Sequence, residues 1–167
     1  MLLREKGFSL LELIFTVVVL VVLLGIGIPS FNSFVQSSRL RAVTHDLTSA
    51  LQLARSEALS QRGTVAVCRA NVAMTACDFD ADWSSGWIVV SQTGTDLEDA
   101  ADVDPVRVWD EVSLTVSGAV TGFVFDRQGQ GTAAAIRIQN DTDHRCLSTN
   151  VSGRVAVREI ASVDSCP

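Results

Sequence analysis

The chain has 167 residues, of which 47% are hydrophobic and 19% are charged, and its formal net charge is −6. This length suits one compact domain with an appendage and disfavours a multidomain enzyme. The composition is too apolar for a disordered chain, and the negative charge disfavours binding of polyanions through the overall electrostatic field.

An apolar stretch near the N-terminus is long enough to cross a membrane. Residues 8–28 contain a single ionisable side chain, that of Glu12. A bilayer core about 30 Å thick needs roughly 20 apolar residues in a helix. We therefore predict a transmembrane helix over residues 8–28. Arg4 and Lys6 precede it, which places the N-terminus in the cytoplasm and the rest of the chain on the opposite side.

A cleavable secretory signal is the alternative, because Gly25 and Gly27 supply small residues for a cleavage site. The apolar stretch is longer than the roughly 7–15 residues of such a signal, and it contains Glu12. A carboxylate inside hydrocarbon costs about 2.5–3.5 kcal/mol, which makes Glu12 a candidate functional residue. The simpler interpretation is a glutamate at the membrane interface.

The sequence KGFSLLEL, at residues 6–13, resembles the processing signal of type IV prepilins and of type II secretion pseudopilins. The resemblance implies that a prepilin peptidase removes a leader peptide, residues 1–7, by cutting between Gly7 and Phe8, and then methylates the new amine. It also implies assembly with other pilins or pseudopilins through the N-terminal helix. The Glu12 carboxylate would then pair with the Phe8 amine of a neighbouring subunit and set the register of the filament.

Residues 29–62 are predicted to form an amphipathic helical stalk. Apolar side chains recur at three- and four-residue steps from Phe31 to Ala58. Pro29 predicts a helix break between the membrane-spanning half and the outer half. A cation followed by a glycine, Arg62-Gly63, predicts the end of the helix.

Residues 63–167 are predicted to form a β-rich globular head. The hydrophobic period changes to two, and short runs rich in valine, isoleucine and aromatic residues alternate with turn signals. The runs are 64–68, 87–91, 106–109, 112–116, 122–126, 134–138, 145–148 and 154–158. A long helix packed on an antiparallel β-sheet is an α+β fold. It matches the pilin-like fold that the resemblance implies, with the head in the periplasm and a single-pass anchor in the bacterial inner membrane.

Four cysteines lie outside the apolar stretch and allow three disulfide pairings. In an oxidising periplasm we expect Cys68–Cys77 and Cys146–Cys166, since each pair joins neighbours in sequence. Each bond would stabilise the head by about 2–4 kcal/mol. A zinc site is the alternative, but the sequence has no C-x-x-C motif and no histidine at metal-ligand spacing from a cysteine.

Residues 78–111 contain ten acidic residues and a single base, Arg107. We interpret this region as a solvated acidic surface in which residues 93–104 form a polar, mobile loop. A calcium loop at residues 78–82 is the alternative, but it lacks the glycine at the sixth position and the glutamate at the twelfth.

No catalytic motif is present. The sequence lacks a P-loop, a G-x-S-x-G motif and a zincin motif. His45 and His144 each lie beside an aspartate, on a helix and on a turn, where solvent-exposed histidines are the ordinary case. We therefore predict a non-enzymatic protein that needs no cofactor.

Four motifs of the outer part resemble the GspH/FimT/FimU group of minor pilins and pseudopilins. They are Arg55-Ser56-Glu57-Ala58, Ser85-Gly86-Trp87-Ile88-Val89-Val90, the set Phe123, Asp126, Gly129 and Gly131, and Ser152-Gly153-Arg154-Val155. The resemblance implies a low-abundance subunit that helps to initiate or cap a type IV pilus, and so serves pilus biogenesis and twitching motility. The alternative is the H-type pseudopilin of type II protein secretion.

Some FimT-like members bind DNA through a C-terminal Gly-Arg-x-Arg element. Here the matching residues 153–156 lack the second arginine. Arg145, Arg154 and Arg158 are candidates for a small basic patch that would give weak, salt-sensitive DNA binding. The alternative is that these arginines pair with the nearby acidic residues Asp141, Asp143, Glu159 or Asp164.

Overall fold

The computed structural model describes residues 9–161 and Cys166, and for residues 26–30 it describes the backbone alone. The predicted cleavage site between Gly7 and Phe8 lies outside the described residues. The chain divides into two compact units, Met1–Gln36 and Ser37–Pro167.

One long helix, α1 (Leu10–Gln61), begins in the first unit and ends in the second. It is continuous through Pro29, so the helix break predicted there is not observed. A proline lacks the N–H donor that would have paired with the carbonyl oxygen of Gly25, four residues earlier, and its ring crowds that carbonyl, but this loss is confined to one turn of a 52-residue helix. The turns on either side keep their hydrogen bonds.

The first unit exposes its apolar side chains. Within the described residues, no helix reaches the length and apolarity required to cross a membrane. The large apolar side chains between Leu10 and Leu24 are each at least 41% exposed, and that of Leu10 is 77% exposed. The side chains described in this stretch therefore form no hydrophobic core within their own unit.

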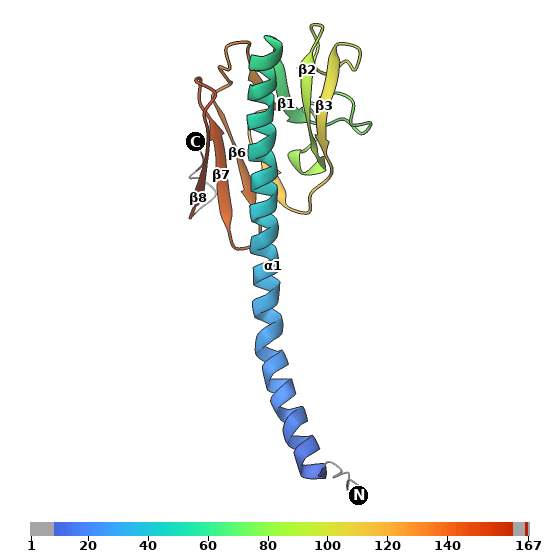
Figure 1. Ribbon diagram of the computed structural model, residues 1–167, viewed down its shortest axis with the longest axis vertical. Helices are drawn as coiled ribbons and strands as arrows, with labels where there is room; N and C mark the ends of the chain where they lie inside the picture. Colours follow the sequence, from blue (N-terminus) through green and yellow to red (C-terminus); the bar gives the residue numbers. More distant parts are fainter. Residues whose placement is uncertain (1–8, 162–165, 167) are drawn as a thin grey trace, which may run out of the picture. The chain divides into compact units, whose positions relative to one another are not determined.

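The second unit combines the part of α1 from Ser37 onwards with two four-stranded antiparallel sheets (Figure 1). The first sheet has the order β3-β2-β1-β5, and the second has the order β4-β6-β7-β8. The strands are β1 (Val65–Arg69), β2 (Trp87–Gln92), β3 (Val103–Trp109), β4 (Thr115–Ser117), β5 (Gly122–Phe125), β6 (Ala134–Gln139), β7 (His144–Thr149) and β8 (Val155–Ile160). A short 3-10 helix, η1 (Trp83–Ser85), precedes β2.

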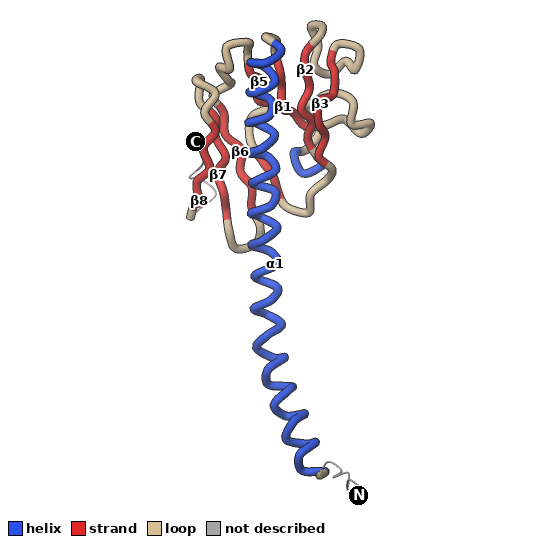
Figure 2. The backbone as a smooth tube through the Cα atoms, in the orientation of Figure 1, coloured by secondary structure: helices blue, strands red, loops and turns tan. Residues whose placement is uncertain are grey.

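Helix α1 packs on both sheets through one hydrophobic core (Figure 2). The helix contributes a stripe of fully buried side chains that includes Leu40, Leu47 and Leu51. The same cluster contains Trp87, Phe123 and Phe125 from the first sheet and Ile136, Ile138 and Leu147 from the second. The α+β fold predicted from the sequence is therefore confirmed, with the strands divided between two sheets.

The first sheet is also covered on the face that points away from α1. A second core cluster there contains Ala66 and Cys68 of β1 and Ile88 and Val90 of β2. Loops cover these side chains through Met74, Phe79 and Leu97. Every residue of β1 from Val65 to Cys68 and of β2 from Trp87 to Ser91 is buried, because both faces of these strands are covered.

Candidate functional site

Glu12 lies in the first turn of α1 and is exposed. Its position at the N-terminal end of the helix is electrostatically favourable for a carboxylate. No other charged residue occurs between residues 9 and 38. Its neighbours Leu11 and Leu13 are 77% and 59% exposed. Between residues 9 and 38 the helix therefore presents a single carboxylate on a largely apolar surface.

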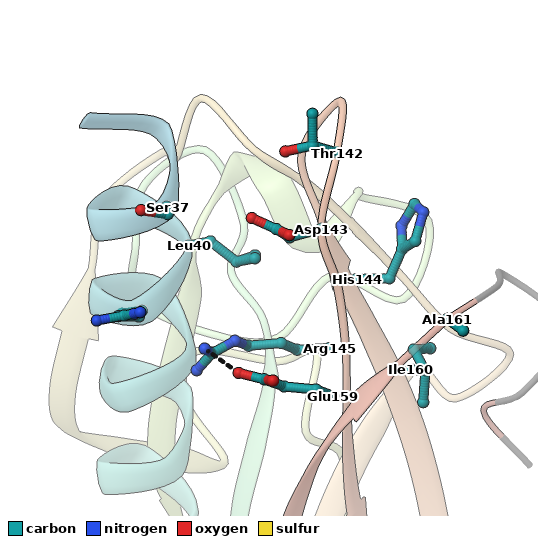
Figure 3. A pocket seen from close by; sticks show the side chains of 10 residues that line it. Ser37, Leu40, Thr142, Asp143, His144, Arg145, Glu159, Ile160 and Ala161 are labelled. Carbon is teal, nitrogen blue, oxygen red and sulfur yellow. Dashed lines mark hydrogen bonds and ion pairs between the residues drawn. The ribbon is translucent and has the colours of Figure 1, made fainter. Parts of the chain in front are cut away.

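The second sheet separates the predicted arginines onto its two faces. Arg145 and Glu159 are directly opposed on β7 and β8 and form an ion pair at 2.8 Å. Figure 3 shows both side chains pointing toward α1, whereas His144 and Ile160 point away. The pair lies in a cleft of about 570 Å³ between α1 and the ends of β7 and β8, which also contains Arg41 and Asp143. Arg145 thus pairs with an acidic residue rather than joining a basic patch.

Arg158 lies on the opposite face of the second sheet, because alternate residues of a strand point to opposite faces. It is aligned across the sheet with Cys146 of β7 and Arg137 of β6. Arg154 is exposed, and it points to the same face as Arg158 because the two residues are an even number of positions apart. The structure therefore places Arg137, Arg154 and Arg158 on one face of the second sheet, with Cys146 between Arg137 and Arg158. Arg137 was not among the residues predicted from the sequence. Arg137 could have been predicted from the register of the hairpin that joins β6 to β7 around Asn140, because that register aligns Arg137 with Cys146.

Arg55, the first residue of the motif Arg55-Ser56-Glu57-Ala58, joins α1 to two turns of the head. Its Nε donates to the carbonyl oxygen of Gly129 at 3.1 Å, and its Nη2 donates to that of Ser152 at 3.0 Å. Gly129 and Gly153 have φ values of +73° and +70°. The two turns also contact each other, since the N–H of Gly131 donates to the carbonyl oxygen of Val151 at 3.1 Å.

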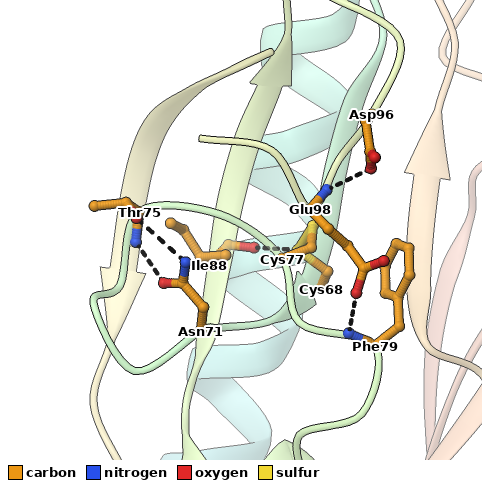
Figure 4. Close-up of a disulfide and its surroundings, with 8 residues drawn as sticks. All are labelled: Cys68, Asn71, Thr75, Cys77, Phe79, Ile88, Asp96 and Glu98. Carbon is orange, nitrogen blue, oxygen red and sulfur yellow. Dashed lines mark hydrogen bonds between the residues drawn. A yellow bond between two sulfur atoms is a disulfide. The ribbon is translucent and has the colours of Figure 1, made fainter. Parts of the chain in front are cut away.

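Two disulfides are present, Cys68–Cys77 and Cys146–Cys166, which is the pairing favoured from the sequence. The Cys68–Cys77 bond belongs to the second core cluster. Figure 4 shows it beside the loop residues Glu98 and Phe79. The Cys146–Cys166 bond attaches the C-terminal end of the chain to β7 on the face away from α1. All four cysteines are thereby used in structural bonds.

Several carboxylates of the acidic loops accept hydrogen bonds from backbone N–H groups of their own loop. Asp78 Oδ1 accepts the backbone N–H groups of Asp80 and Ala81 at 2.9 and 3.1 Å. Asp102 Oδ2 accepts those of Thr95 and Asp96 at 2.8 and 3.0 Å, and these bonds lower the pKa of Asp102. The loop is therefore ordered by Asp102. Within the described residues, no group of three or more acidic, histidine or cysteine residues forms a metal site.

Most of the second unit matches one family of proteins. The model of the family described as "Type II transport protein GspH" matches residues 43–153, which is more than half of the chain. The chain belongs to the GspH family. The match includes most of the part of α1 that packs on the head and strands β1 to β7, and it ends before β8. The GspH/FimT/FimU pilins are structural subunits of pili and pseudopili, so membership agrees with a non-enzymatic role.

Solved structures of one pilin are similar to this GspH-family chain. A crystal structure of the type IV minor pilin FimU from Pseudomonas aeruginosa is 25% identical, has a TM-score of 0.56, and covers 73% of this chain and 98% of FimU. A second crystal form of FimU is 24% identical, with a TM-score of 0.58 and coverage of 77% and 98%. No curated protein matches the chain significantly.

Proposed function

We propose that this GspH-family chain is a minor pilin that helps to initiate or cap assembly of a type IV pilus. The observation that carries the proposal is the similarity to the minor pilin FimU, which extends over 98% of the FimU chain. The first unit supports the proposal, because a helix with exposed apolar side chains on all sides requires lipid or other helices to cover it.

In this proposal Glu12 fixes the axial position of the subunit. A carboxylate buried among apolar helices is stable only when a positive group compensates its desolvation. Processing between Gly7 and Phe8 would create such a group, the N-terminal amine of Phe8 in a neighbouring subunit. Because the ion pair forms at one position along each helix, it stabilises one axial offset between neighbouring helices relative to all other offsets. Prepilin peptidase and the other pilins are the partners in this scheme.

Before assembly, the subunit would be anchored in the bacterial inner membrane by residues 8–28, with residues 63–167 in the periplasm. The 21 residues of the proposed anchor contain no charge besides Glu12. The two disulfides favour an oxidising compartment for the head. A substitution of Gly7 by a bulky residue tests the processing step: we expect the leader to remain attached, which mass spectrometry of the purified chain detects.

A role as the H-type pseudopilin of type II secretion is the second candidate, and the description of the matching family favours it. Deletion of the gene separates the two. Loss of twitching motility with normal release of secreted proteins supports the pilus, whereas the reverse result supports the secretion system. Loss of DNA uptake alone would support a DNA receptor, for which Arg154 and Arg158 are the candidate residues. Complementation with the intact gene is the control.

A further inference from the structure

The four sheet edges of the head are not equally protected against pairing with another strand. Pro105 interrupts β3, and the pairing of β3 with β2 shifts register between Val89 and Val90. Strand β4 has only three residues. The outer side of β5 is occupied, because the N–H of Thr132 donates to the carbonyl oxygen of Val124 at 3.0 Å. Prolines, bulges, short length and covering segments are the usual means of blocking an edge.

Among the described residues, strand β8 has none of these features. Its six residues pair with β7 in an unbroken register and include neither proline nor glycine. In the part of the chain that the structure describes, no other strand pairs with it. The carbonyl oxygen of Arg154 accepts the N–H of Asn150 at 3.2 Å. In an antiparallel pair, every second residue directs its N–H and C=O groups toward the partner strand. Since Arg154 bonds toward β7, the N–H and C=O groups of Val155, Val157 and Glu159 point to the free edge.

The side chains beside this edge define the chemistry of a strand that could pair there. Arg154 and Arg158 are exposed on the face away from α1, and neither guanidinium forms an ion pair with a described residue. The cross-strand neighbours of Arg158 on that face, Cys146 and beyond it Arg137, carry no negative charge. On the other face, Val157 is 40% exposed. A partner strand would therefore place acidic residues beside the arginines and apolar residues beside Val157.

We propose that the free edge of β8 binds an extended segment of a partner protein in which acidic and apolar residues alternate. Backbone hydrogen bonds to Val155, Val157 and Glu159 supply affinity, and the two arginines select acidic side chains on one face of the added strand. This contact lies on the head and goes beyond assembly through α1. It does not require Glu12, leader processing or a filament.

The test uses the full chain in detergent micelles and two synthetic seven-residue peptides. In one peptide valine alternates with aspartate, and in the other valine alternates with lysine. We expect the aspartate peptide to bind about ten-fold more tightly or better by fluorescence anisotropy. It should also slow hydrogen exchange of the amides of Val155, Val157 and Glu159. Absence of binding, equal binding of both peptides, or protection at another strand would overturn the proposal.

Two variants separate the backbone and charge contributions. Val157→Pro removes an N–H that points away from β7, so the hairpin is retained and peptide binding is lost. Replacing Arg154 and Arg158 together by alanine should abolish the preference for aspartate, whereas Arg127→Ala, at an exposed turn, is the matched control and should retain it. The double arginine variant decides the outcome if the proline variant does not fold.

Self-association of the edge is a separate outcome. If the β8 amides exchange more slowly as the protein concentration rises, without any peptide, then the edge binds a second copy of the chain. That result would overturn the proposed partner.

Discussion

The guanidinium of Arg55 donates from Nε to the carbonyl oxygen of Gly129 at 3.1 Å, across 74 positions of sequence. The same side chain also reaches the carbonyl oxygen of Ser152. Helix α1 is thereby joined to the turn after β5 and to the turn between β7 and β8. One cation thus connects the helix with both sheets at the end of the head where α1 terminates.

Replacing Arg55 by alanine should lower the free energy of unfolding by about 1.5–3 kcal/mol, because hydrogen bonds to a charged group are stronger than neutral ones. Arg55→Lys should recover only part of this loss, since an ammonium group lacks the planar fork that reaches both carbonyls. Chemical denaturation of the full chain in detergent measures the effect. Arg39→Ala, at an exposed position of the same helix, is the control and should change stability by less than about 0.5 kcal/mol. An equal effect of the two variants would contradict the role of Arg55.

Replacing Gly153 by alanine should destabilise the head by about 1–3 kcal/mol. Its φ of +70° disfavours any L side chain, and an added Cβ would lie 2.1 Å from the carbonyl oxygen of Gly129. Thermal unfolding followed by circular dichroism measures the change. Gly63→Ala is the matched control, because nothing lies within 4 Å of a Cβ added there. A neutral Gly153→Ala variant would show that the two turns are not held together as described.

Replacing Glu12 by alanine should leave the chain inserted in the membrane and processed but poorly incorporated into filaments. The physical reason is the loss of the carboxylate that we propose to pair with the amine of Phe8. Quantification of the subunit in sheared filaments and in the membrane fraction measures the distribution. Glu57→Ala, which removes a carboxylate bonded to Gln61 at 2.9 Å near the other end of α1, is the control. Normal incorporation of the Glu12 variant would remove the proposed role.

The loop of residues 95–102 should open in acid. Backbone N–H groups of Thr95 and Asp96 favour the ionised form of Asp102 and lower its pKa from the ordinary value of 3.8. A lowered pKa in the folded state contributes stability above the ordinary value, and this contribution is lost as the pH falls through the lowered pKa. Hydrogen exchange at Thr95 and Asp96, measured between neutral pH and pH 2 and corrected for the intrinsic rate, should show the opening. In Asp102→Asn the protection should be weaker at neutral pH and independent of this titration.

Local patterns predicted the elements well, because each is determined by the periodicity of its own residues. All eight predicted strands are present, although β3 begins at Val103 rather than at residue 106 and β4 spans Thr115–Ser117 rather than residues 112–116. The division into two sheets was not predicted. Alternation identifies which side chains share a face, but it does not identify which strands are neighbours. The burial of β1 and β2 on both faces depends on loops that carry no periodic signal.

The sequence predicted those parts of the candidate site whose residues lie close together along the chain. The disulfide pairing followed from the proximity of the cysteines, and the isolated carboxylate of Glu12 is evident from its apolar neighbours. Contacts between distant segments were missed. Arg137 and Arg158 are aligned on one face only because of the registers of two hairpins. Asp102 accepts backbone N–H groups of its loop, and no sequence pattern indicates these hydrogen bonds. Arg145 pairs with Glu159, one of the acidic partners proposed from the sequence as the alternative to a basic patch, but that it faces away from Arg158 depends on those same registers.

The bond between Cys146 and Cys166 has a mechanical consequence for a subunit under tension. A force applied at the C-terminal end passes through the two sulfur atoms directly into β7, so the segment between the two cysteines, which are 20 positions apart in sequence, bears none of it. Strand β8 lies within this unloaded segment. Pulling on the chain from its end therefore cannot peel the outermost strand from the sheet, and any mechanical rupture must begin elsewhere in the head.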